Sequence, residues 1–141
     1  MDDKDKQLLN LLSENSRSST TTLARMLGLS RSTVQDRIRR LEDRGIIAGY
    51  TIRLNEAFSQ RLISAQVMMT FQPKYATAIL QALKKMPGVV SIFTVSGIYD
   101  LIATVRAQTT EELDTTIDNI GILTGMEKTT TSIILSRKYE V

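Results

Sequence analysis

Two short helical patterns separated by a Gly-Leu-Ser turn are the feature that most constrains how this chain can fold. The first pattern covers residues 20–27 and follows Ser19, a residue type that commonly caps helices. Gly28 stands where a helix often ends in the left-handed conformation, and Ser30 can cap the second pattern, residues 31–44, directly afterwards. This order of caps and apolar stripes predicts a helix-turn-helix.

The segments on either side of this motif extend it into a domain. A helix is expected before it, beginning at an acidic cap, Asp2 or Asp3, and ending near Ser13. After it, the segment IIAGYTIRLN alternates in a way that predicts a short pair of strands, the wing of a winged helix. Residues 1–54 are therefore expected to form a winged helix-turn-helix domain.

The remainder of the chain follows a different pattern. Residues 55–62 lose the periodicity and are expected to form a linker. Beyond them the expected order is strand, helix, strand, strand, helix, strand, over residues 64–72, 75–86, 89–96, 101–107, 110–120 and 132–136. This order predicts a ferredoxin-like βαββαβ domain at residues 63–141, so the fold class is α+β.

The composition excludes several classes of protein. Cysteine, histidine and tryptophan are absent, which removes disulfides, thiolate chemistry, zinc clusters and the usual neutral-pH general base. Catalysis by carboxylates or lysine remains open in principle, but the sequence contains no pair of acidic residues within a motif typical of an active-site cleft. No apolar run approaches the ~18 residues of a membrane span, and the acidic start is unlike a secretory signal. We expect a cytoplasmic non-enzyme with no catalytic residues, metal site or membrane partner.

Positive charge is concentrated in the first part of the chain. Residues 1–61 contain 11 Lys and Arg against 8 Asp and Glu, whereas residues 62–141 contain 7 of each. From Arg17 to Arg44 there are seven arginines, three acids and no lysine. Guanidinium groups can bind phosphates and base edges with two hydrogen bonds at once, so this distribution favours double-stranded DNA as a partner.

The helix expected over residues 31–44 has two distinct faces. Val34, Ile38 and Leu41 share one face and should be buried, while the opposite face is polar. The N-terminal part of a recognition helix lies deepest in the major groove, so the candidates for contacts with base edges are Ser32, Thr33, Gln35 and Arg37. The candidates for phosphate contacts are Arg17, Arg31, Arg39 and Arg40. The alternative is a solvated face with local ion pairs, such as Asp36 with Arg39 or Arg40.

The sequence resembles the Lrp/AsnC regulators, or feast/famine proteins, of bacteria and archaea. The resemblance covers nearly the whole chain and rests on LARMLGLS, RIRRLEDRGII and GY in the first domain and on VSGIYDLIATV and TTTSIILS in the second. It implies a sequence-specific DNA-binding transcriptional regulator whose third helix enters the major groove. It also implies homodimers built from the second domain, an octamer of four dimers, and small effectors, commonly amino acids, bound between dimers.

The same resemblance suggests an effector site in the second domain. In the family the turn matching GIYD helps to form the pocket, which points here to Gly97, Tyr99 and Asp100, and threonines near the last strand correspond to Thr129 and Thr131. A carboxylate could accept from an amino-acid ammonium, and hydroxyls could donate to its carboxylate. The alternative is that GIYD is only a hairpin turn. In that case the protein would be a DNA-binding regulator or an architectural protein whose second domain serves assembly alone and binds no ligand.

The sheet of the second domain raises a question of partners. Helices of a ferredoxin-like fold cover one face, and Val67, Met69 and Phe71 suggest that the other face is too apolar for solvent, which predicts a sheet-to-sheet homodimer. RNA-recognition modules have the same order of elements, but the exposed basic and aromatic pattern that they require is not evident here. A small-molecule enzyme on this scaffold is disfavoured because histidine and cysteine are missing.

Overall fold

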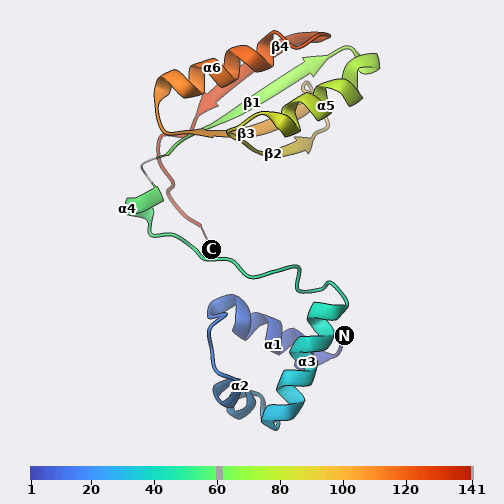
Figure 1. Ribbon diagram of the computed structural model, residues 1–141, viewed down its shortest axis with the longest axis vertical. Helices are drawn as coiled ribbons and strands as arrows, with labels where there is room; N and C mark the ends of the chain where they lie inside the picture. The colour runs from blue at the N-terminus through green and yellow to red at the C-terminus, as the bar shows by residue number, and fades with distance from the viewer. Residues whose placement is uncertain (60–61, 141) are drawn as a thin grey trace. The chain divides into compact units, whose positions relative to one another are not determined.

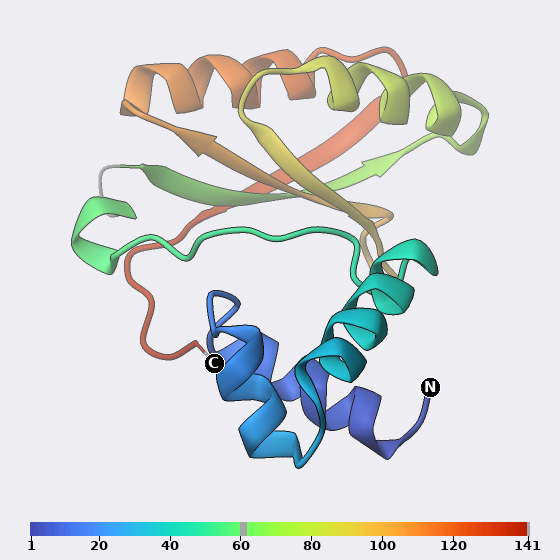
Figure 2. The same ribbon diagram turned by 60° about the horizontal axis from the view of Figure 1, so that its bottom comes forward.

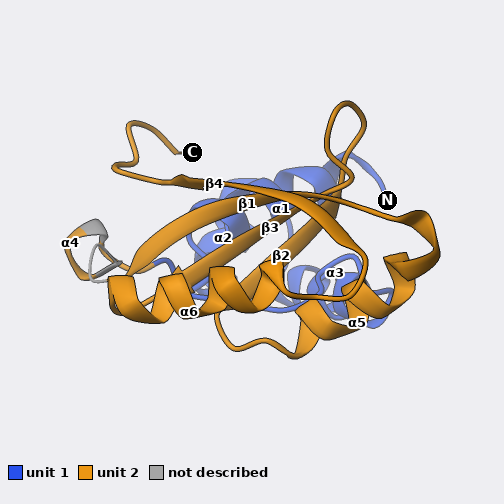
Figure 3. Ribbon diagram, turned by 90° about the horizontal axis from the view of Figure 1, so that it is seen from above, with its two compact units in different colours: residues 1–53 blue, residues 54–141 orange. Residues whose placement is uncertain are grey.

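The computed structural model describes residues 1–59 and 62–140 and contains two compact units. The units comprise residues 1–53 and 54–141 (Figure 3). The predicted linker, residues 55–62, includes a four-residue helix, α4 (Glu56–Ser59), and residues 60 and 61, which lie outside the described part.

The first unit consists of three helices, α1 (Asp3–Glu14), α2 (Thr20–Leu27) and α3 (Arg31–Asp43) (Figure 1). Their caps confirm the predicted helix-turn-helix. The side chain of Ser19 accepts a hydrogen bond from the backbone N–H of Thr22, and Ser30 accepts one from Thr33. Gly28 ends α2 in the left-handed region at φ 68°. The short turn between α2 and α3 therefore arises from local capping interactions.

A small apolar core holds these helices together. All three contribute to its buried residues, which are Leu8, Leu23, Ala24, Leu27, Val34 and Leu41. Ile38 is partly buried against them, so the predicted apolar face of α3 is confirmed. The predicted wing is wrong, because no residue from 46 to 55 belongs to a strand. Alternation can favour an extended segment, but an isolated two-stranded ribbon is marginally stable in water.

The second unit contains an antiparallel sheet and two long helices. Its strands are β1 (Ile63–Phe71), β2 (Val89–Thr94), β3 (Leu101–Ala107) and β4 (Met126–Ile133), arranged in the order β2-β3-β1-β4. A short 3₁₀ turn, η1 (Pro73–Tyr75), precedes α5 (Ala76–Lys85), and α6 (Thr110–Gly121) connects β3 to β4. Both helices lie on the same side of the sheet (Figures 1 and 2). The βαββαβ prediction is confirmed.

Strand β4 begins earlier than predicted. It was expected over residues 132–136 but extends from Met126 to Ile133 and pairs antiparallel with β1. Its sequence, MEKTTTSI, has little apolar alternation, so hydrophobic patterning could not reveal its first residues. Pairing with β1 supplies the backbone partners that make this polar segment a strand.

The covered face of the sheet is the one that carries Val67 and Met69. Both are fully buried with Ile79 of α5 and Leu113 of α6, and Phe71 packs at the edge of the same cluster. The prediction that these residues lie on the open face is therefore wrong. Strand alternation separates two faces but does not determine which one the helices cover.

The open face has a mixed character. The register places Gln66 and Met68 of β1 beside Thr104 and Ile102 of β3. Gln66 is exposed and the other three side chains are half-buried. Phe93 of β2 pairs with Ile102 and is 57% exposed.

No helix among residues 1–59 and 62–140 is long and apolar enough to cross a membrane.

Candidate functional site

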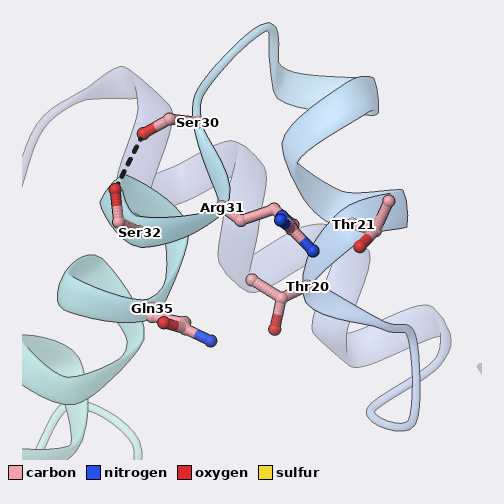
Figure 4. A pocket seen from close by; sticks show the side chains of 6 residues that line it. All are labelled: Thr20, Thr21, Ser30, Arg31, Ser32 and Gln35. Atoms are coloured by element: carbon pink, nitrogen blue, oxygen red, sulfur yellow. Dashed lines mark hydrogen bonds between the residues drawn. The ribbon is translucent and has the colours of Figure 1, made fainter.

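A polar hollow of about 700 Å³ lies at the N-terminal ends of α2 and α3. The residues that line it are Thr20, Thr21, Ser30, Arg31, Ser32 and Gln35. In Figure 4 the side chain of Arg31 extends from the start of α3 toward the two threonines of α2, and Gln35 follows about one turn further along α3. Arg31, Ser32 and Gln35 are predicted DNA-contact residues, whereas Thr20 and Thr21 have no predicted role.

The chemistry of this hollow suits an anion. The first amide groups of a helix have no intrahelical acceptor, and the helix dipole places partial positive charge at the same end. Two helices begin here, and the guanidinium of Arg31 adds a full positive charge. Phosphate oxygens can accept from such amides, from hydroxyls and from arginine. The hollow therefore has the donors needed to hold one group of a phosphate backbone.

The hydroxyls at the start of α3 have different roles. Ser30 Oγ lies 2.7 Å from Thr33 Oγ1 and 3.2 Å from Ser32 Oγ, and it accepts from the backbone N–H of Thr33. Thr33 is half-buried in this arrangement, whereas Ser32 and Gln35 are exposed. Of the predicted base-edge residues, Ser32 and Gln35 thus have side chains in the hollow, while Thr33 is engaged in the helix cap.

Arg37 lies in a different environment from the other arginines. Its Nη1 atom is 2.8 and 2.9 Å from the two carboxylate oxygens of Asp2 and 3.0 Å from Oδ1 of Asp5. The Arg37 side chain is only 19% exposed. We therefore revise its assignment as a base-edge candidate, because its charge is already paired with two carboxylates. The helical spacings that predict ion pairs within one helix give no sign of this pair, whose partners are 35 residues apart.

The Arg37 contacts change the ionisation of Asp2. The hydrogen bond from Arg37, together with one from the backbone N–H of Asp5, lowers the pKa of the Asp2 carboxyl below its ordinary value of 3.8. In return, hydrogen bonds to Asp2 and Asp5 raise the pKa of Arg37. Both shifts favour the charged pair at neutral pH.

Acidification should weaken the first unit through this pair. The folded pKa of Asp2 is depressed, so its stabilising contribution is present above the unfolded pKa near 3.8 and is lost as pH falls through the folded value. Asp2→Asn keeps a good helix cap but cannot ionise, so its free energy of unfolding should depend less on pH below ~4. Urea unfolding between pH 6 and 3, followed by circular dichroism, measures this difference. Identical pH dependences for the wild type and Asp2→Asn would contradict it.

The other predicted phosphate-binding arginines are on the exposed surface of the first unit. Arg17 lies in the loop after α1, and Arg40 is exposed on α3. Arg39 forms an ion pair of 3.6 Å with Asp36, but the two side chains are 70% and 60% exposed. Exposed pairs of this kind contribute little and exchange readily with solvent, so Arg39 remains available to another anion.

The GIYD segment, residues 97–100, joins β2 to β3 and brings together a second group of polar side chains. Tyr99 Oη donates to Thr130 Oγ1 over 3.1 Å. Asp100 Oδ2 accepts from the backbone N–H of Phe71 over 3.2 Å, and Gly97 adopts φ 114°, which favours glycine. The Asp100 side chain thus bonds the neighbouring strand β1, and not its own turn as the hairpin interpretation predicted.

The last strand contributes a residue that was not predicted. Thr130 pairs with Met68 and reaches Tyr99 on the open face. Thr129 and Thr131 pair with Met69 and Val67, so the register places them on the helix-covered face. The structure therefore brings Thr130, and not its two neighbours, to Tyr99. Only the register of β4 could distinguish among three consecutive threonines.

In the described part of the chain, no cluster of acidic residues is arranged to hold a metal ion.

Comparison with known proteins agrees with both halves of this architecture. The model of the AsnC-type helix-turn-helix domain matches residues 1–42, and that of the Lrp/AsnC ligand binding domain matches residues 64–140. The chain is 33% identical over 139 residues to the HTH-type transcriptional regulator LrpA of Pyrococcus abyssi. The alignment covers 97% of this chain and 98% of LrpA.

Solved structures share the fold over nearly the whole chain. AsnC of E. coli has a TM-score of 0.90 at 22% identity and covers 100% of this chain and 96% of its own. The transcriptional regulator NMB0573 of Neisseria meningitidis, solved as an L-Met complex, has a TM-score of 0.89 at 22% identity, with coverage of 99% and 93%. Together with the helix-turn-helix and the βαββαβ unit, these matches show that the chain belongs to the Lrp/AsnC family of helix-turn-helix transcriptional regulators.

Proposed function

We propose that this regulator reads specific duplex DNA with α3 in the major groove and the hollow beside it on the phosphate backbone. The observation that carries the proposal is the meeting of two helix N-termini with Arg31 and Gln35. Arg31 and the first amides of α2 would hold a phosphate, which sets the register of the protein on DNA. Gln35 and Ser32 would contact base edges, since a glutamine amide can pair with adenine through two hydrogen bonds.

The remaining arginines would extend the same contact. Arg17, Arg39 and Arg40 are exposed, and they would bind phosphates without reading sequence. Thr33 would act mainly by capping α3, and Arg37 by its contacts within the unit. This division leaves two side chains to read bases and four arginines to bind the backbone.

Selection of duplexes from a random library by the full-length protein tests the proposal. We expect an enriched sequence that binds at least about a thousandfold more tightly than a scrambled duplex, with affinity that decreases steeply as salt increases. Failure to enrich any sequence, with equal binding to all duplexes, would contradict sequence-specific recognition.

Assembly through the open face of the sheet is a second part of the proposal. Met68, Ile102 and Phe93 give this face an apolar component that a second copy could cover. A two-fold dimer would present two α3 helices to half-sites about one turn of DNA or a multiple apart. The resemblance implies that four such dimers associate into an octamer, in a protein expected to be cytoplasmic. Sedimentation of the purified protein would measure this assembly.

An amino-acid effector is the third part of the proposal. Its support is the match of residues 64–140 to a ligand binding domain and the L-Met complex of the structural neighbour. One oxygen of Asp100 accepts from the backbone N–H of Phe71 and leaves the other for an ammonium group, while Thr130, whose oxygen accepts from Tyr99, could donate its own hydroxyl proton to a carboxylate. Gly97 would shape the turn, and Thr129 and Thr131 would have no direct contact.

Calorimetric titration with each of the twenty amino acids should identify an effector, and two substitutions should weaken its binding. Asp100→Asn is expected to reduce affinity about tenfold to a hundredfold because it removes a charge-assisted hydrogen bond. Thr130→Val should reduce it about two- to tenfold, while the matched control Thr129→Val should have no effect. Absence of heat with every amino acid, with unchanged DNA affinity, would favour a domain that serves assembly alone.

A further inference from the structure

The first turn of α1 contacts both of the other helices in its unit through charged side chains. Lys4 Nζ donates to the backbone carbonyl of Leu27 at the end of α2 over 2.7 Å. Asp2 and Asp5 bind Arg37 in the middle of α3. We call these five residues the first-turn clamp. The clamp connects α1 to both helices of the helix-turn-helix.

The two acids of the clamp are themselves held in place by the helix cap. Asp2 Oδ1 accepts from the backbone N–H of Asp5 over 2.9 Å, and Asp5 Oδ2 accepts from that of Asp2 over 3.3 Å. Oδ1 of Asp2 also accepts from Arg37, so one carboxylate caps α1 and binds α3. The helix cap thus holds both carboxylates in the orientation in which they bind the guanidinium.

Arg37 sits at the edge of the apolar face of α3. It follows Val34 by three residues and precedes Leu41 by four, and both of these are buried. Asp5 is 16% exposed, so this ion pair is more shielded from solvent than a surface pair. Arg37 Nε is buried and has no hydrogen-bond partner in the described part of the chain, so the guanidinium depends on its Nη1 contacts.

We propose that Arg37 is a positioning residue, and that the first-turn clamp fixes the rotation of α3 at which Arg31 and Gln35 can meet DNA together. The inference rests on the proposed contact between α3 and DNA. Its consequence is that two acids on α1 are needed for binding to a polyanion. A recognition helix that rotates on a core of only six buried residues would lose the alignment of its base-reading side chains.

The sign of one substitution separates positioning from direct contact. If Arg37 reads DNA itself, then Asp2→Asn/Asp5→Asn would release it and remove two negative charges, and both changes should strengthen binding. If Arg37 positions α3, the same double variant should weaken binding despite its more favourable charge. Asparagine preserves the helix cap at position 2, so the variant mainly removes the ion pair.

The experiment compares full-length variants on the duplex that the wild type selects and on its scrambled form. Asp2→Asn/Asp5→Asn is expected to weaken binding to the selected duplex about tenfold or more and to reduce discrimination. The control Asp3→Asn/Glu14→Gln removes two exposed acids from the same helix and should bind as tightly as the wild type or more tightly. Unchanged or tighter binding by Asp2→Asn/Asp5→Asn would overturn the proposal.

A conservative variant keeps the test decisive if the double variant folds poorly. All three clamp contacts of Arg37 end on Nη1, so the single ammonium of Arg37→Lys can replace them, whereas it cannot replace a bidentate contact with a base. Positioning predicts binding within a few-fold of the wild type for Arg37→Lys. A large loss of discrimination, with an unchanged circular dichroism spectrum, would overturn it.

Combination of substitutions completes the test. Arg37→Met in the background of Asp2→Asn/Asp5→Asn should add little further loss, because both changes disrupt the same clamp. If Arg37 contacts DNA directly, the double variant alone should keep its affinity for DNA, and the affinity should fall only when Arg37→Met is added. A wild type that selects no duplex would refute the proposed function itself, and a wild type that selects one but tolerates the double variant would refute only the clamp.

Discussion

Arg31→Ala is expected to weaken binding to every duplex, whereas Gln35→Ala should cost about 1–3 kcal/mol of discrimination at one base pair. Both side chains line the hollow at the start of α3. Arg31 carries a charge that any phosphate can use, so its loss should be independent of sequence. Gln35 is neutral and can distinguish bases through its amide, so its loss should affect the selected duplex and leave the scrambled one nearly unchanged.

Measurements at several salt concentrations distinguish the two roles further. Arg31→Ala should reduce the slope of log affinity against log salt by about 1, because one phosphate contact is lost, and Gln35→Ala should not change it. Two matched controls lie elsewhere in the same unit: Arg25 is an exposed arginine on α2, and Gln7 is an exposed glutamine on α1. Substitution of either control by alanine should have a smaller effect. Equal losses from Arg31→Ala and Gln35→Ala on both duplexes would contradict this division.

Gly125→Ala is expected to destabilise the second unit by about 2–6 kcal/mol. Gly125 adopts φ 90°, and a Cβ atom there would overlap the Cβ, Cγ and Cδ2 atoms of Tyr75. The left-handed backbone conformation and the forced repacking each cost about 1–3 kcal/mol. The carbonyl of Gly125 also accepts from the backbone N–H of Gln72, so the loop cannot move away without losing this hydrogen bond.

Gly121→Ala provides the matched control for this prediction. Gly121 is the last residue of α6, and a Cβ atom there would meet nothing within 4 Å. Alanine should stabilise the helix by about 0.4–1 kcal/mol because it reduces the freedom of the unfolded chain. Urea unfolding followed by circular dichroism compares the two variants. A free energy of unfolding for Gly125→Ala close to that of the wild type would show that Tyr75 can move aside at little cost.

Local sequence determined the three helices of the first unit and the order of strands and long helices in the second. Ser19, Gly28 and Ser30 mark the ends of α2 and α3 because caps act over two to four residues, within the reach of a sequence pattern. The apolar face of α3 and the strand and helix order of the second unit follow from short periodicities in the same way. Three residues that line the hollow, Arg31, Ser32 and Gln35, could be named as candidates for DNA contact for this reason, since they belong to the outer face of one predicted helix.

Tertiary structure decided everything that depends on a partner distant in the chain. Arg37 meets Asp2 across 35 residues, Tyr99 meets Thr130 across 31, and neither pair has a spacing that a sequence pattern can recognise. The same limit explains the error over Val67 and Met69, because alternation defines two faces of a strand but not which of them the helices cover. The alternation of residues 46–55 predicts a pair of strands that the structure lacks, because a strand also requires hydrogen bonds to a second strand and alternation alone cannot establish them.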